Sequence, residues 1–86
     1  MARRFTEKQG QYLAFIYNYT LLLGQAPSEA DMQRFFGKTP PTIHQMVLKL
    51  AELQLISRKP GEARSIALLI DPDEIPRLLR PSTGQL

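Results

Sequence analysis

The fold is decided by residues 28–45, which read SEADMQRFFGKTPPTIHQ. Ser28 can cap a helix, and the acidic residues that follow it suit the positive end of the helix dipole. Gly37 predicts the end of this helix, because a residue without a Cβ adopts the left-handed conformation most easily. Thr39 and the two prolines after it predict the capped start of a second helix. Prolines are accepted there because the first helical N–H groups have no intrahelical partner. This stretch therefore predicts two helices separated by a very tight turn.

A longer helix precedes this pair. Thr6 followed three residues later by Gln9 matches a capping box, and Phe5 can pack against the first turn. Gly24 predicts where the helix ends. Between them, apolar residues recur at the spacing of an α-helix, at Tyr12, Phe15, Ile16, Tyr19 and Leu23. The sequence thus predicts one long helix over residues 6–23 with an apolar face.

The last of the three helices has two different faces. Its apolar stripe consists of Ile43, Met46, Val47, Leu50 and Leu53. The opposite face carries Pro41, His44, Gln45, Leu48 and Glu52, with Thr42 and Lys49 on one flank. Helices of this size bury too little surface alone, so the apolar stripes are expected to meet in one core. That packing turns the polar face outward.

A strand pair is predicted to follow the helices. Residues 55–58 and 65–70 are rich in apolar residues, and the loop between them, residues 59–64, contains Pro60 and Gly61. Three helices and a small antiparallel β-hairpin predict a mostly α protein with the winged helix-turn-helix fold. We expect residues 1–70 to form this domain. Residues 71–86 form a C-terminal extension, with a short helix from Asp71 to Leu79 and a frayed end.

Charge and residue types narrow the class of function. The chain carries a net charge of +3, and residues 1–70 hold nine basic against five acidic residues, which suits a polyanionic partner. There is one histidine and no cysteine, so we expect no metal site and no cofactor. No nucleophile has a base beside it, so we expect no enzyme activity. No signal peptide or membrane-spanning run is evident, which predicts a cytoplasmic protein without membrane contact.

In their order and spacing, several segments of the chain resemble the N-terminal DNA-binding domain of LexA-type repressors, a bacterial family. The resemblance covers about residues 5–70 and rests on residues 5–9, 24–28, 39–45 and 60–66, together with Val47 and Leu50. It implies a winged helix-turn-helix and a role in repressing transcription. Nothing after Ile70 resembles the self-cleaving peptidase half of these repressors, so the resemblance implies no protease function.

The chain also departs from the family's pattern. The turn after Gly37 is one residue shorter than usual, and Gln33 stands where the family has a small residue. His44 and Gln45 occupy the family's acidic or polar base-contacting positions, and Leu48 replaces a polar residue. The family's operator sequence is therefore not carried over to this chain.

These observations predict two sets of DNA-contacting residues. An α-helix fits the major groove, where glutamine can bond adenine through two hydrogen bonds and histidine can donate to guanine. The predicted base-contacting residues are Thr39, Pro41, Thr42, His44 and Gln45. The predicted backbone contacts are Lys38, Lys49, Arg58, Lys59 and Arg64. Among the latter we expect Arg64 to contribute most, because a guanidinium can bind a phosphate through two hydrogen bonds.

Two functions from different classes fit the sequence. The first is sequence-specific binding of double-stranded DNA, with the third helix in the major groove and the hairpin on the backbone. One such helix covers only about four to six base pairs, which predicts a weak homodimer or pairing of two copies on DNA. The alternative is a winged-helix module for protein–protein interaction that binds no DNA. Its apolar contact surface would consist of Tyr17, Leu21, Leu22 and Leu48.

Overall fold

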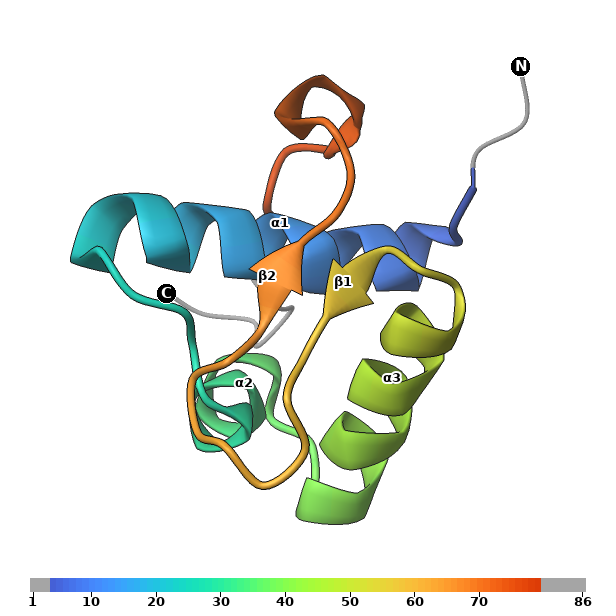
Figure 1. Ribbon diagram of the computed structural model, residues 1–86. Coiled ribbons are helices and arrows are strands. Elements are labelled where there is room, and N and C mark those ends of the chain that lie inside the picture. The colour runs from blue at the N-terminus through green and yellow to red at the C-terminus, as the bar shows by residue number, and fades with distance from the viewer. Residues whose placement is uncertain (1–3, 80–86) are drawn as a thin grey trace.

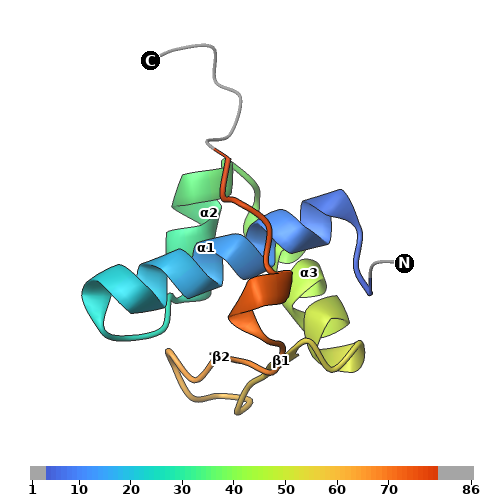
Figure 2. The same ribbon diagram turned by 90° about the horizontal axis from the view of Figure 1, so that it is seen from above.

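The computed structural model describes residues 4–79 of the chain. Figure 1 shows a long helix lying above two shorter ones, with a small hairpin beside them, and Figure 2 confirms from above that the long helix crosses the other two. The mostly α winged helix-turn-helix fold predicted from the sequence is confirmed. In chain order the elements are α1 (Glu7–Leu23), α2 (Glu29–Phe36), α3 (Pro40–Glu52), β1 (Ile56–Ser57), β2 (Ala67–Leu68) and the 3-10 helix η1 (Pro72–Glu74).

The predicted caps of α1 and α2 are present. At α1, the Gln9 N–H donates to the Thr6 hydroxyl at 3.1 Å, and the Thr6 N–H donates to the Gln9 side chain at 2.9 Å. Ser28 and Asp31 form the same reciprocal pair of bonds at α2. Gly24 ends α1 with φ of 75°, a left-handed conformation that favours glycine. Local sequence therefore sets the limits of these two helices.

The start of α3 differs from the prediction. Thr39 occupies the N-cap position, but its hydroxyl accepts no backbone N–H, so the predicted side-chain cap is wrong. The hydroxyl instead donates to the Thr42 hydroxyl at 3.0 Å. Pro41, at the second helical position, has no N–H and removes one of the two backbone donors that an N-cap side chain can bind.

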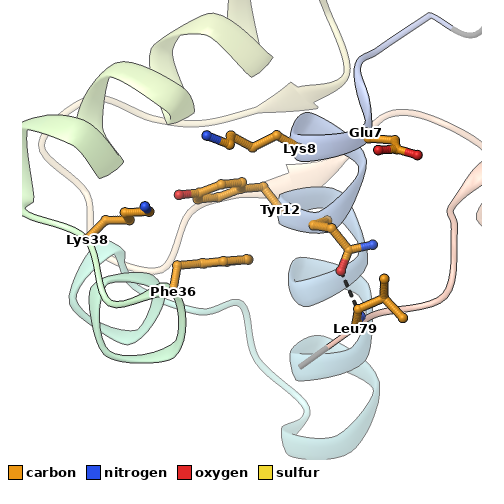
Figure 3. Close-up of a pocket in the computed structure, with 7 residues that line it drawn as sticks. Glu7, Lys8, Tyr12, Phe36, Lys38 and Leu79 are labelled. Atoms are coloured by element: carbon orange, nitrogen blue, oxygen red, sulfur yellow. Dashed lines mark hydrogen bonds between the residues drawn. The ribbon is translucent and has the colours of Figure 1, made fainter. Parts of the chain in front are cut away.

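The core lies where the three helices and β1 meet. Its aromatic part joins α1 to α2: the Tyr12 and Phe36 rings stack with centroids 4.0 Å apart and an interplanar angle of 16°, as Figure 3 shows. Phe15 lies between Phe35 and Tyr19, at centroid distances of 4.7 and 5.6 Å. The buried core residues are Phe5, Tyr12, Leu13, Phe15, Ile16, Met32, Ile43, Val47, Leu50, Leu55, Ile56 and Ile70.

The hairpin is shorter than the sequence predicts. β1 and β2 pair antiparallel over two residues each, with Ile56 opposite Leu68, whereas the sequence predicts strands over 55–58 and 65–70. A side chain replaces part of the expected ladder: the Ser65 hydroxyl accepts the Lys59 N–H at 2.8 Å and donates to the Lys59 carbonyl at 3.2 Å. These bonds close the base of residues 59–64, which we call the wing loop.

The predicted helix from Asp71 to Leu79 is also shorter, because only η1 forms. Ile75 precedes Pro76, and a residue before proline is pushed into extended conformation. The chain then runs along α1, where the Gln11 amide donates to the Arg77 carbonyl at 2.9 Å and accepts the Leu79 N–H at 2.7 Å. The predicted frayed end, Pro81 to Leu86, lies outside the described residues.

The two faces of α1 provide a first test. The Leu13 side chain is fully buried, whereas Leu22 on the same helix is 78% exposed. Leu13→Ala should lower the free energy of unfolding by about 3 kcal/mol, since it leaves a cavity. Leu22→Ala, the matched control, should change it by less than about 0.5 kcal/mol. Urea unfolding followed by circular dichroism measures both, and equal losses for the two variants would contradict this packing.

Candidate nucleic-acid interface

The five predicted base-contacting residues lie on one exposed part of the molecule. Thr39 is the N-cap of α3, and the other four fall within its first two turns. All five are exposed, and we call this set the reading face, consisting of Thr39, Pro41, Thr42, His44 and Gln45. The burial of Ile43, Val47 and Leu50 on the opposite side of α3 turns this face outward.

His44 has a partner that the sequence analysis missed. Its Nδ1 lies 3.1 and 3.2 Å from the two carboxylate oxygens of Glu29, the first residue of α2. An ionised carboxylate can only accept, so Nδ1 carries the hydrogen in this contact. A neutral ring then offers Nε2 as an acceptor. Two residues fifteen positions apart, on different helices, give no local sequence signal for such a pair.

The predicted backbone-contacting lysines are exposed. Lys38 lies in the α2–α3 turn, Lys59 begins the wing loop, and Lys49 lies on α3 at 3.7 Å from Glu52. Arg58 is half-buried next to Lys59. The wing loop and the start of α2 enclose a pocket of about 340 Å³, lined among others by Ser28, Glu29, Arg58, Lys59, Gly61 and Arg64. The hairpin and the start of α2 thus share one concave surface, whose lining includes three basic side chains and the two acidic side chains Glu29 and Glu62.

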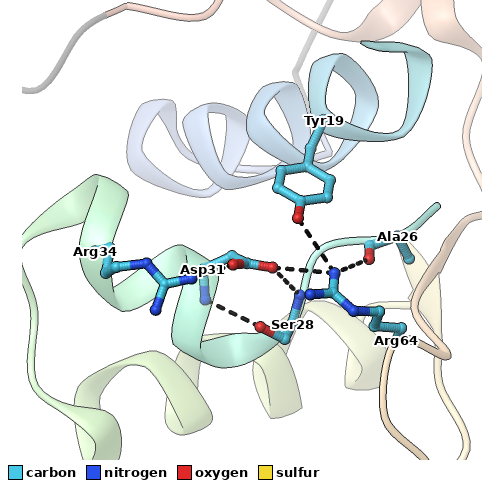
Figure 4. Close-up of polar contacts among 6 residues, drawn as sticks. All are labelled: Tyr19, Ala26, Ser28, Asp31, Arg34 and Arg64. Atoms are coloured by element: carbon cyan, nitrogen blue, oxygen red, sulfur yellow. Dashed lines mark hydrogen bonds and ion pairs between the residues drawn. The ribbon is translucent and has the colours of Figure 1, made fainter. Parts of the chain in front are cut away.

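Arg64 differs most from its predicted role. The sequence predicts a guanidinium that reaches outward, but Figure 4 shows it directed at α1 and α2. Its Nη1 donates to the Ala26 carbonyl at 2.9 Å, to Asp31 Oδ2 at 3.1 Å and to the Tyr19 hydroxyl at 3.2 Å. We call this group, Tyr19, Ala26, Asp31 and Arg64, the wing clamp. The wing clamp holds the wing loop against α1 and α2. Arg64 and Asp31 are 33 positions apart in the sequence.

Asp31 is the centre of the wing clamp. Its side chain is buried, accepts the Ser28 N–H at 2.9 Å and forms a second ion pair with Arg34. The hydrogen bond from the Ser28 N–H lowers the pKa of Asp31 to about 2, helped by the Arg64 charge, although burial acts in the opposite direction. The carboxylate therefore stays ionised at neutral pH and holds both arginines.

The residues of the predicted apolar contact surface differ in their exposure and lie on two helices. Leu21 and Leu22, near the end of α1, are 66% and 78% exposed, and Leu48 on α3 is 38% exposed. Tyr17 is half-buried. The structure therefore leaves an apolar patch at the end of α1, and Leu48 lies apart from it on α3.

The comparisons with known proteins agree with the resemblance noted in the sequence. No protein-family model matches the chain. It is 39% identical over 84 residues to the LexA repressor of Thermosipho melanesiensis, an alignment that covers 98% of this chain and 41% of that protein. The chain is related to the LexA repressors. The LexA repressor of Thermosipho africanus is 35% identical over 85 residues, with 96% of this chain and 43% of that protein covered.

This LexA-related chain spans about two fifths of the length of the curated relatives it matches. Within residues 4–79, no cluster of three or more histidine, aspartate or glutamate side chains is arranged to hold a metal ion. None of the helices in this part of the chain has the length and apolar character needed to span a membrane.

Because the pKa of Asp31 is lowered in the folded protein, the free energy of unfolding should depend on pH in the acidic range. Because the folded pKa lies below the unfolded value of 3.8, the contribution is complete above about pH 4 and is lost as the pH falls towards 2. It should amount to at most about 2.5 kcal/mol, since one pKa unit corresponds to about 1.4 kcal/mol. Asp31→Asn should be less stable than the wild type at pH 7 and approach it at pH 2.

Urea midpoints measured from pH 2 to pH 7 test this directly. Glu62→Gln, which removes an exposed carboxylate from the wing loop, is the matched control and should follow the wild-type curve. If the wild type and Asp31→Asn lose stability in parallel as the pH falls, the ionised Asp31 carboxylate does not contribute the expected stability.

Proposed function

We propose that this chain binds double-stranded DNA sequence-specifically and represses transcription, with α3 in the major groove and the wing loop on the DNA backbone. One observation carries the proposal: an exposed polar reading face adjoins a basic hairpin, in a chain related to LexA repressors. Both curated relatives are named repressors. The structure supports the proposal by leaving these side chains accessible.

The reading face offers a definite set of donors and acceptors. Gln45 can bond the N6 and N7 atoms of adenine together. His44 has Nδ1 bound to Glu29 and turns Nε2 to the outside. Nε2 of a neutral ring accepts from the amino group of adenine or cytosine, and Nε2 of a protonated ring donates to guanine. Thr42 accepts from Thr39 and keeps its own hydroxyl hydrogen for a base or a phosphate. Pro41 adds an apolar surface for a thymine methyl group.

Phosphate contacts would fix the position of α3 in the groove. Lys38, Lys49, Arg58 and Lys59 are the side chains that we assign to them, because ammonium and guanidinium groups neutralise backbone phosphates without selecting sequence. Arg64 can add a contact only through the nitrogens other than Nη1, which binds within the protein. Its main contribution is then to hold the wing loop against α1 and α2.

Two copies are needed for a specific site, because one reading helix covers only about four to six base pairs. We propose that two copies pair on DNA with half-sites about one helical turn apart. The exposed Leu21 and Leu22 favour a second candidate function, binding of another protein through the apolar patch at the end of α1. The two functions differ in whether the chain binds duplex DNA at all.

Binding to duplex DNA should weaken as salt increases. About three to five neutralised phosphates per copy predict a slope near −3 to −5 for the logarithm of the binding constant against the logarithm of salt concentration. Fluorescence anisotropy with a labelled duplex from a selected pool measures this slope. A slope near zero, or no binding at low salt, would reject DNA binding and leave the protein-interaction function.

Two variants separate base contacts from backbone contacts. Gln45→Ala should change the preferred base at one position of the site, where a good bidentate contact discriminates by about 1–3 kcal/mol. Lys59→Ala should weaken binding to all duplexes about equally and lower the salt slope by about one. Selection of bound duplexes from a random pool, repeated for each variant, distinguishes the two. An unchanged selected motif for Gln45→Ala means that Gln45 contacts no base.

A further inference from the structure

A pocket of about 330 Å³ is lined by none of the reading-face residues. It is formed by the first half of α1, the end of α2, the α2–α3 turn and the segment that follows η1. Its lining residues are Glu7, Lys8, Gln11, Tyr12, Phe36, Lys38 and Leu79. Lys38 is the one member of this set to which the proposed DNA interface already assigns a contact.

The Tyr12 hydroxyl in this pocket has no hydrogen-bond partner among residues 4–79, although Tyr12 is only 2% exposed. Its ring is fixed by the stack on Phe36, so the hydroxyl cannot turn away without breaking that packing. A buried hydroxyl that forms no hydrogen bond is unfavourable and is rare in native structures. Figure 3 shows this hydroxyl lying between the ends of the Lys8 and Lys38 side chains.

Two ammonium groups point to the same place. Figure 3 shows the side chains of Lys8 and Lys38 extending towards the Tyr12 hydroxyl from different parts of the chain, while the Glu7 carboxylate points to the other side of α1. Burial raises the pKa of Tyr12, so its hydroxyl keeps its proton and can donate. The pocket therefore gathers three hydrogen-bond donors, two of them positively charged.

We propose that Lys8, Tyr12 and Lys38 form a binding site for a phosphate group. Three convergent donors with two positive charges suit an anion that has several acceptor oxygens and carries up to two negative charges. The phosphate can come from the DNA backbone or from a small phosphorylated molecule. A DNA phosphate as the ligand rests on the proposed function. The site itself does not, because the protein assembles the three donors without DNA.

Inorganic phosphate is the probe, and the first experiment contains no DNA. Thermal unfolding of the full chain in phosphate and in chloride, at matched ionic strength, should give a higher midpoint in phosphate because a ligand stabilises the state that binds it. Phosphate also stabilises proteins in general, and that part is common to all variants. Tyr12→Phe, which keeps the ring and removes the hydroxyl, and Lys8→Gln should lose the additional increase.

Arg4→Gln is the matched control. It removes one positive charge from the same end of the chain but lies outside the pocket, in an exposed pair with Glu74 at 3.9 Å. This variant should keep the wild-type response. Titration of tyrosine-labelled protein by NMR should show one saturable shift of the Tyr12 ring, with a Kd about tenfold weaker in Lys8→Gln. An equal phosphate response in the wild type and Tyr12→Phe, or no saturable shift, would overturn the site.

A second arm identifies the source of the phosphate. If a DNA phosphate occupies the site, Lys8→Gln should weaken duplex binding severalfold more than Arg4→Gln and lower the salt slope by about one. If a small molecule occupies it, the two variants should bind duplex equally and still differ in their response to inorganic phosphate. If the chain binds no duplex at all, the proposed function is rejected. The phosphate site is then still tested by the titration with inorganic phosphate.

Discussion

The Asp31 carboxylate takes part in two sets of contacts at once. It completes the cap of α2 through Ser28, and it binds Arg64 of the wing loop across 33 residues of sequence. A hairpin with only two residues in each strand has few bonds of its own, and two-stranded sheets have little stability alone. The position of the wing loop relative to α2 and α3 therefore depends on this ion pair and on the bonds that Arg64 makes to Tyr19 and Ala26.

The same arrangement links the fold to the proposed function. A protein that contacts DNA with a helix and a loop needs both at a fixed distance, because the groove and the phosphates beside it have a fixed spacing. The Arg64 side chain points inward to its partners on the helices, from a backbone with φ of 55°, whereas the lysine side chains of the interface are exposed. One basic residue of the hairpin thus positions the loop, while Lys59 remains exposed and Arg58 is half-buried.

Sequence was sufficient for most of the features whose signal is local, although the Thr39 cap is an exception. The caps at Thr6 and Ser28, the left-handed Gly24 and the apolar periodicity of α1 each involve residues within a few positions, and the structure confirms them. The prediction was wrong where side chains changed the backbone hydrogen bonding, as at Ser65 in the wing loop, and where Pro76 prevented a helix. The contacts of Glu29, Asp31 and Tyr12 join distant segments, and only the packed core brings these together.

The two prolines at the start of α3 have a consequence for how tightly any ligand is held there. A helix N-terminus commonly binds anions through its unpaired backbone N–H groups, and Pro40 and Pro41 lack them. The backbone at this end of α3 therefore contributes fewer donors than most helices offer. Proline rings also fix φ, so the first turn loses less conformational entropy when it becomes ordered against a surface. Side chains must supply the attraction, and the rigid start of the helix lowers the entropic cost of placing them.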